Sequence, residues 1–176
     1  MKKLIPGTNR AFTKEDAFQG FKEMIELTNG LSLGQVCSIS DLDPTIIQNW
    51  VKRGYVSRPI KKKYYEKQLA RILMINSLRE AMKIEDIGKL MILINGDVED
   101  ESDDLISEEQ LYTLFSRVIY HLESFNDVDS TIKKVMKQAK RNDDKLKNAL
   151  ETMVYAHIAS NHKKESKKYM KLLAKD

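Results

Sequence analysis

Apolar residues recur every three or four positions along most of this chain, and that spacing predicts helices rather than strands. The first run covers residues 17–28. Thr13, with Asp16 three residues later, is typical of a helix start, and Asn29-Gly30 is suited to a left-handed helix end. We therefore expect a preliminary helix near the N-terminus.

Two short helices are predicted next, joined by a tight link. The first starts at the cap Ser32. The second has Asp43 as its cap, followed by Pro44 at the first helical position, where a missing amide proton costs nothing. It continues to Arg53, and Gly54 ends it. This order of elements outlines a helix-turn-helix.

The segment 55–64 cannot extend that second helix, because it contains Pro59 and two β-branched residues. We interpret it as a small wing or loop. Two longer helices are predicted beyond it, over residues 65–81 and 85–94, and the charged residues 97–106 are expected to form an acidic linker.

A second helix start follows the linker, where Ser107 and Gln110 match a capping box. The apolar residues after it have spacings of 4, 3, 4 and 3, which is the rhythm of a helix that packs along a partner helix. We expect this seam to pair two subunits; it consists of Leu111, Phe115, Val118, Leu122 and Phe125. Two further helices are predicted within residues 130–171.

The pattern therefore predicts an all-α chain in four parts. These are an N-terminal helix at 1–30, a winged helix-turn-helix at 31–96, the acidic linker at 97–106 and a helical dimerisation or regulatory region at 107–176. Seven glycines and three prolines in 176 residues agree with helices, since turn-rich β-proteins need more of both.

Cysteine content and hydropathy narrow the class of protein further. A single cysteine excludes an internal disulfide framework and a zinc site made of several thiolates. No apolar run approaches the length of about 18 residues that spans a membrane, and the first residues lack the apolar stretch of a signal peptide. We expect a cytoplasmic protein without a membrane partner.

The net charge of +4 conceals a strongly polarised distribution. Residues 52–83 carry ten basic and two acidic side chains, residues 84–110 carry one and ten, and residues 133–176 carry thirteen and five. Two basic blocks thus flank an acidic one, and the basic blocks could meet a polyanion.

The outer face of the second short helix offers groups that could read DNA bases. Helical period buries Ile46, Ile47, Trp50 and Val51 and leaves a polar set outside: Thr45, Gln48, Asn49 and Lys52. Amides can pair with adenine, and a cation can bind guanine or phosphate. An ordinary solvated helix face would explain the same residues.

A basic cluster with interleaved tyrosines follows this face at once. Like charges at such density repel one another unless a polyanion neutralises them. A solvated surface would also carry lysines, but the position directly after the helix-turn-helix outline favours nucleic acid. The cluster consists of Lys52, Arg53, Arg58, Lys61, Lys62 and Lys63, with Tyr55, Tyr64 and Tyr65.

Four stretches within residues 31–95 carry a family resemblance: Leu33 to Cys37, Ile47 to Val56, Tyr64 to Ile72 and Ile84 to Leu90, and the helix after them is a looser parallel. In this order they resemble the DNA-binding domain of MerR-type bacterial transcription regulators. The C-terminal part is similar to an uncharacterised family of Gram-positive bacterial proteins whose N-terminal half is MerR-like. The resemblance implies a winged helix-turn-helix fold and binding to double-stranded DNA as a homodimer, with no effector identified.

Four departures limit what the resemblance implies. Gln48 and Asn49 stand where the family usually has arginine and an aromatic residue, so base preference is not implied. Asp43 replaces the usual serine cap, and the wing is short and lacks glycine. Family members that sense metals or oxidants use cysteines after the dimerisation helix, and this chain has none there.

Other candidate chemistry is sparse, and we expect neither an enzyme nor a bound metal or cofactor. His157 and His162 are five residues apart, which misses the spacing that puts two ligands on one helical face, and His121 is distant. Cys37 is expected to be an inert, buried thiol. The acidic run from Asp97 lacks the glycine of a calcium loop.

The leading hypothesis is therefore a sequence-specific, DNA-binding transcriptional regulator that acts as a dimer on a pseudo-palindromic site. A first alternative is a protein-interaction module whose basic block binds an acidic protein or the chain's own residues 97–104. A second is a small-molecule sensor with a C-terminal pocket lined by Tyr112, Phe115, Tyr120 or Tyr155.

Overall fold

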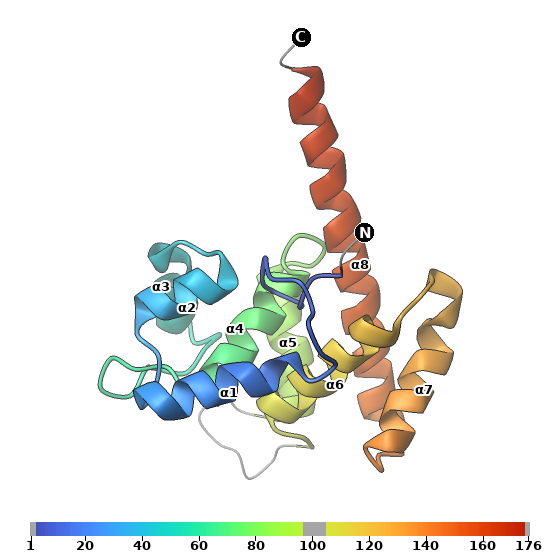
Figure 1. Ribbon diagram of the computed structural model, residues 1–176, viewed down its shortest axis with the longest axis horizontal. Helices are drawn as coiled ribbons and strands as arrows, with labels where there is room; N and C mark the ends of the chain where they lie inside the picture. The colour runs from blue at the N-terminus through green and yellow to red at the C-terminus, as the bar shows by residue number, and fades with distance from the viewer. Residues whose placement is uncertain (1–2, 97–104, 175–176) are drawn as a thin grey trace.

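The computed structural model describes residues 3–96 and 105–174 and is all-helical there, as the sequence predicted (Figure 1). The described part contains no strand. The elements are α1 (Ala17–Thr28), α2 (Leu33–Ser40), α3 (Pro44–Lys52), α4 (Glu66–Leu78), α5 (Ile84–Asn95), α6 (Glu108–His121), the 3-10 helix η1 (Phe125–Asp127), α7 (Val128–Gln138) and α8 (Asp144–Leu173).

Helix α4 is the central element, and every residue from Gln68 to Leu78 is buried. It packs against α2 and α5, which precede the acidic segment in the sequence, and against α6 and α8, which follow it. Helix α1 also contacts α4 and α6. One hydrophobic core therefore extends through both halves of the chain.

The segment before α1 crosses the central helices and is fixed by backbone contacts. Gly7 has φ +75°, and a Cβ there would lie 2.1 Å from the carbonyl oxygen of Leu73 on α4. The hydroxyl of Tyr112 on α6 donates to the carbonyl of Pro6 at 2.7 Å. Helix α1 itself begins later than predicted, because Asp16 rather than Thr13 occupies its N-cap position.

The first of the two short helices has the capping hydrogen bond predicted for it, and the second begins at the predicted residues without one. Ser32 accepts a hydrogen bond from the backbone N–H of Gln35, and the Gln35 side chain accepts one from the Ser32 N–H. Asp43 precedes Pro44 at the start of α3, although its carboxylate makes no capping hydrogen bond. Ile47 and Trp50 anchor α3 to the core.

The expected wing is reduced to a two-residue turn with isolated bridges. Ile60 and Lys63 exchange two backbone hydrogen bonds of 2.9 Å, and Lys61 and Lys62 between them have φ +49° and +64°. Positive φ at both central residues is typical of the type I′ hairpin turn. Tyr64 then pairs with Leu31 through two backbone bonds of 2.8 Å, which closes the segment against the residue that precedes the cap of α2.

The residues of the predicted dimerisation seam do not form an exposed apolar face on one helix. Leu111, Phe115 and Val118 are buried in the chain's own core, where α6 packs on α4, α7 and α8. Leu122 follows the end of α6, and Phe125 belongs to η1, so the five residues do not line one helix. The apolar spacing is real, but the partner helices are those of the same chain.

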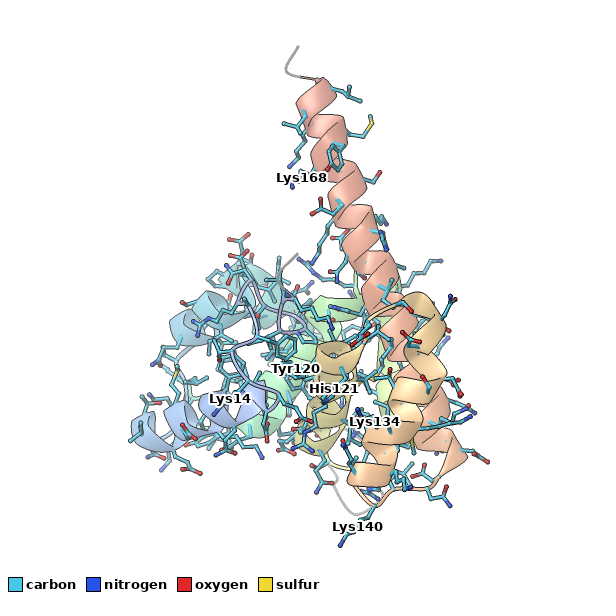
Figure 2. The ribbon with its side chains drawn as sticks, turned by 45° about the vertical axis from the view of Figure 1, so that its right-hand side comes forward. Lys14, Tyr120, His121, Lys134, Lys140 and Lys168 are labelled. Atoms are coloured by element: carbon cyan, nitrogen blue, oxygen red, sulfur yellow. The ribbon has the colours of Figure 1, made fainter. Side chains whose placement is uncertain are left out.

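Helix α8 is divided into a buried and a projecting half. Its first half packs on α4, α5, α6 and α7 and buries Leu146, Leu150 and Met153. Its second half extends beyond the body of the molecule, and Lys168 points outward from it (Figures 1 and 2). Despite its length, neither α8 nor another described helix is apolar over enough residues to cross a membrane.

Candidate nucleic-acid interface

The candidate interface centres on the outer face of α3. Thr45, Gln48, Asn49 and Lys52 are all exposed, while Ile47 and Trp50 on the opposite side are buried. These four exposed residues make no side-chain hydrogen bond or ion pair in the part of the chain that the structure describes. Two amides, a hydroxyl and an ammonium are thus free to bind an external partner.

Arg53, at the end of α3, is engaged within the chain. Its Nη2 lies 2.8 Å from Oε1 of Glu85 on α5, and its guanidinium lies 4.9 Å from the centre of the Tyr55 ring. A backbone hydrogen bond to the Glu85 carboxylate, together with this ion pair, holds the pKa of Glu85 below its ordinary value. Because both partners remain about half exposed, a phosphate could still compete for the arginine.

The turn after α3 presents two lysines to solvent. Lys61 and Lys62 are exposed and make no ion pair with a described residue, and Ile60 beside them is 59% exposed. Lys63 is different, because it is half-buried and its Nζ donates to the carbonyl of Gly30 at 3.2 Å. The tip therefore offers two free cations rather than the three expected.

Tyr64 was expected to contact DNA, and the structure places it in the core. Its side chain is 4% exposed, and burial raises its pKa above the ordinary value. Successive residues of an extended segment point to opposite sides, so the residue paired with buried Leu31 points inward. Arg58 is exposed, as a phosphate contact requires.

A buried arginine that sequence reasoning missed fixes the exit from α3. Arg71 of α4 donates from Nε to the carbonyl of Tyr55 at 2.7 Å, and its Nη1 lies 2.6 Å from Oε1 of Glu108 on α6. Both charged side chains are 2% exposed. Arg71 thus joins the candidate interface to the C-terminal half. A charged residue inside the apolar run of α4 was the signal in the sequence.

A basic groove, also missed, continues the interface beyond the end of α3. It has a volume of about 470 Å³ and is lined by Trp50 and Arg53, by Arg79 and Lys83 of the α4–α5 turn, and by Lys163 of α8. Glu80 on its wall binds Lys167 at 2.7 Å, which holds the pKa of this carboxyl below its usual range. The groove places Lys163, the first lysine of the projecting half of α8, near the end of α3.

The remaining candidates for chemistry lie in packed surroundings. His157 is buried, hydrogen-bonds Ser77 at 2.6 Å, and has its pKa lowered to about 4 by burial. Cys37 is half-buried, and burial with the nearby Asp43 raises the pKa of its thiol. Within residues 3–96 and 105–174, no three His, Cys, Asp or Glu side chains lie close enough to hold a metal ion.

The four aromatic residues suggested for a sensor pocket do not surround a common cavity. Tyr112 and Phe115 are fully buried in the core, whereas Tyr155 is 52% exposed on α8. Tyr120 lies at the end of α6 and packs edge-on against Phe12 (Figure 2). Core packing therefore accounts for the positions of Tyr112 and Phe115.

Comparison with known proteins gives a family but no activity. The family model described as "Domain of unknown function (DUF1836)" matches residues 22–115. A curated relative, the "Uncharacterized protein YkrK" of Bacillus subtilis (strain 168), is 29% identical over 115 residues, which cover 61% of this chain and 49% of the relative. The chain thus spans about half of that protein.

No solved structure matches the chain significantly. The resemblance to an uncharacterised family of Gram-positive bacteria is confirmed by the family and the relative. The family match covers α2 to α5 and reaches into α6, so it lies mainly N-terminal to the region in which the sequence placed that resemblance.

Proposed function

The chain belongs to the DUF1836 family, and we propose that it is a sequence-specific DNA-binding regulator that acts as a dimer. The observation that carries this proposal is the free polar face of α3 beside a turn with two free lysines. Thr45, Gln48, Asn49 and Lys52 are exposed along one side of a helix whose other side is fixed in the core. We infer that α2, α3 and the turn form a MerR-like winged helix-turn-helix with a minimal wing.

In this proposal α3 enters the major groove, whose width of about 12 Å admits one helix. Gln48 and Asn49 pair with adenine edges, and Lys52 binds guanine or phosphate. Lys61 and Lys62 contact the phosphate backbone beside the groove. Arg58 adds a further phosphate contact, while Arg53 does so only by exchanging Glu85 for phosphate.

In this proposal two copies of the chain pair through the projecting half of α8 and not through the predicted seam of residues 111–125. Tyr169, Leu172 and Leu173 are exposed along one face of this half, and exposed Tyr155 lies two heptads before Tyr169, in the packed half. The helical period puts the lysines at 163, 164, 167 and 171 on the other side of the helix, where Lys163 and Lys167 bind Glu80. A second copy would cover the apolar face and leave Lys164 and Lys171 in water.

The first test is the selection of bound fragments from genomic DNA with the full chain, which reports binding and the symmetry of the site together. We expect a motif with two related half-sites about 34 Å apart between centres, or a multiple of that spacing. No enrichment, together with no anisotropy change on random duplex DNA at low salt, would refute DNA binding and favour a protein-interaction module.

Two variants then separate base reading from phosphate binding. Asn49→Ala should cost about 1–3 kcal/mol on the selected site and little on random DNA. Lys62→Ala should weaken binding to all sequences and reduce the salt dependence by about one unit of slope. Equal losses from both variants on both kinds of DNA would contradict the assignment of Asn49.

Sedimentation equilibrium tests the second half of the proposal. A Tyr169→Glu/Leu173→Glu variant should be monomeric at concentrations where the wild-type chain is a dimer, because charges at the centre of an apolar seam oppose pairing. Lys164→Glu/Lys171→Glu changes charge on the opposite face of the same helix and should leave the dimer intact. Loss of the dimer in both variants would contradict the assigned face.

A further inference from the structure

A depression between the end of α7 and the start of α8 gathers an excess of positive charge. Its volume is about 660 Å³, within the range of about 300–1,000 Å³ found for small-molecule sites. Five cationic side chains line it: Lys133, Lys137, Lys140, Arg141 and Lys147. In Figure 1 this end of the molecule lies far from α3, so the depression is separate from the candidate DNA interface.

Only two of the five cations are neutralised by residues that the structure describes. Lys133 and Lys147 share Asp129 at 2.7 and 2.8 Å, and Lys147 also reaches Glu151 at 3.2 Å. Lys137, Lys140 and Arg141 form no ion pair with any residue in the described ranges. Three cations without an ion-pair partner among the described residues therefore occupy five consecutive positions, and a bound anion would relieve their mutual repulsion.

Backbone hydrogen bonds hold these three cations at one rim. The N–H of Lys140 donates to the carbonyl of Lys137 at 3.1 Å, and the N–H of Arg141 donates to the carbonyl of Met136 at 2.9 Å. Lys140 adopts φ +55°, which turns the chain sharply between the helices. Figure 2 shows Lys140 at the tip of this turn. The closed turn thus fixes the backbone that carries these three side chains.

The two carboxylates at the depression do not cancel this charge. Asp143 caps α8, because its Oδ1 accepts the N–H of Leu146 at 2.7 Å. Asp144 lies in the first turn of α8, where negative charge is balanced by the positive end of the helix dipole. Neither makes an ion pair with Lys137, Lys140 or Arg141 in the described part of the chain.

We propose that this depression binds a small polyanion that carries two or more phosphate groups. Three free cations at one rim match several negative charges on one molecule, and the guanidinium of Arg141 can bind a phosphate through two parallel hydrogen bonds. A monovalent anion would leave two of the three cations unpaired. The proposal does not depend on DNA binding through α3, because the depression lies far from that helix (Figure 1).

Isothermal titration calorimetry with sodium tripolyphosphate, at constant ionic strength and without DNA, tests the site on the full chain. A Lys137→Ala/Arg141→Ala variant should bind at least about tenfold more weakly than the wild type. The matched control is Lys134→Ala/Lys145→Ala, which removes the same charge from exposed positions on α7 and α8 that do not line the depression. The control should bind within about threefold of the wild type.

Two results would overturn the proposal, provided that circular dichroism shows both variants to be folded. One is the absence of binding by the wild type at about 1 mM tripolyphosphate. The other is an equal loss of affinity in the two double variants, which would show a diffuse effect of net charge. Competition between a short random duplex and tripolyphosphate for the site would assign the surface to nucleic acid and overturn the small-ligand proposal as well.

Discussion

Removal of one partner from the buried ion pair of Arg71 and Glu108 should strongly destabilise the protein. The two side chains are 2% exposed, and their charged atoms lie 2.6 Å apart. A single substitution leaves the other charge buried without its partner, which costs about 3–5 kcal/mol. We therefore expect Glu108→Gln and Arg71→Met each to lower the free energy of unfolding by about that amount.

The expected loss is large enough to measure in two ways. For a chain of this length, about 1 kcal/mol corresponds to about 2–4 °C in Tm, so each variant should melt about 6–20 °C below the wild type. Circular dichroism at 222 nm gives the Tm. Urea unfolding gives the free energy, and an unchanged slope of free energy against urea would show that the two states remain comparable.

The double variant Arg71→Met/Glu108→Leu decides whether the ion pair is the cause. With no charge left in the core, it should be more stable than either single variant. It still lacks the hydrogen bond from Arg71 to the carbonyl of Tyr55, which is worth about 1 kcal/mol. If the losses of the single variants add in the double variant, or if each is below about 1 kcal/mol, the reasoning is refuted.

Three further predictions rest on local geometry. Gly7→Ala should destabilise by at least about 1 kcal/mol in urea unfolding, because its Cβ would overlap the Leu73 carbonyl; an unchanged midpoint would contradict that packing. The pKa of buried His157, about 4, lies below its unfolded value, so stability should fall by up to about 3 kcal/mol from pH 6.5 to pH 4. His157→Leu should remove much of this dependence, and an unchanged pH profile would contradict it. Lys61→Asn/Lys62→Gly should raise the Tm by a few degrees and weaken DNA binding; equal affinity would argue against phosphate contacts there.

Local signals in the sequence were sufficient to place most of the helices. Ser32 and Ser107 accept the hydrogen bonds that their capping patterns predicted, and Pro44 begins α3. Each of these features depends on residues within four positions of one another, so the chain alone determines them. Thr13 was the exception, because the contacts of the preceding segment with α4 and α6 delay the start of α1 to Ala17.

Long-range packing could not be predicted in the same way. The spacing of Leu111, Phe115 and Val118 shows that one face of α6 is apolar, but it does not show which surface covers that face. The covering surface is α4, α7 and α8 of the same chain. Similarly, Arg71 is conspicuous inside an apolar run, yet its partner Glu108 lies 37 residues away, beyond the acidic segment.

The exposure of the candidate site residues was predicted correctly on helix α3, where the helical period applies. It was predicted incorrectly in the extended segment that follows. Period alone put Gln48 and Asn49 outside and Trp50 inside, as the structure has them. In the following turn, the prediction rested on the density of basic residues and did not consider in which direction each side chain points. Lys63 and Tyr64 belong to the basic cluster in sequence, but hydrogen-bond pairing turns the first toward Gly30 and the second into the core.

Lys61 and Lys62 are unfavourable residues for the backbone conformation of the turn that they form, and this bears on function. Both residues have positive φ, which costs roughly 1–2 kcal/mol for a side chain that is neither glycine nor asparagine. Neither lysine makes a hydrogen bond or ion pair with a described residue that would offset this cost. Strain of this kind is typical of functional sites. A polyanion at the turn would supply the missing interaction, so the local geometry and the free charges both favour the proposed contact with DNA.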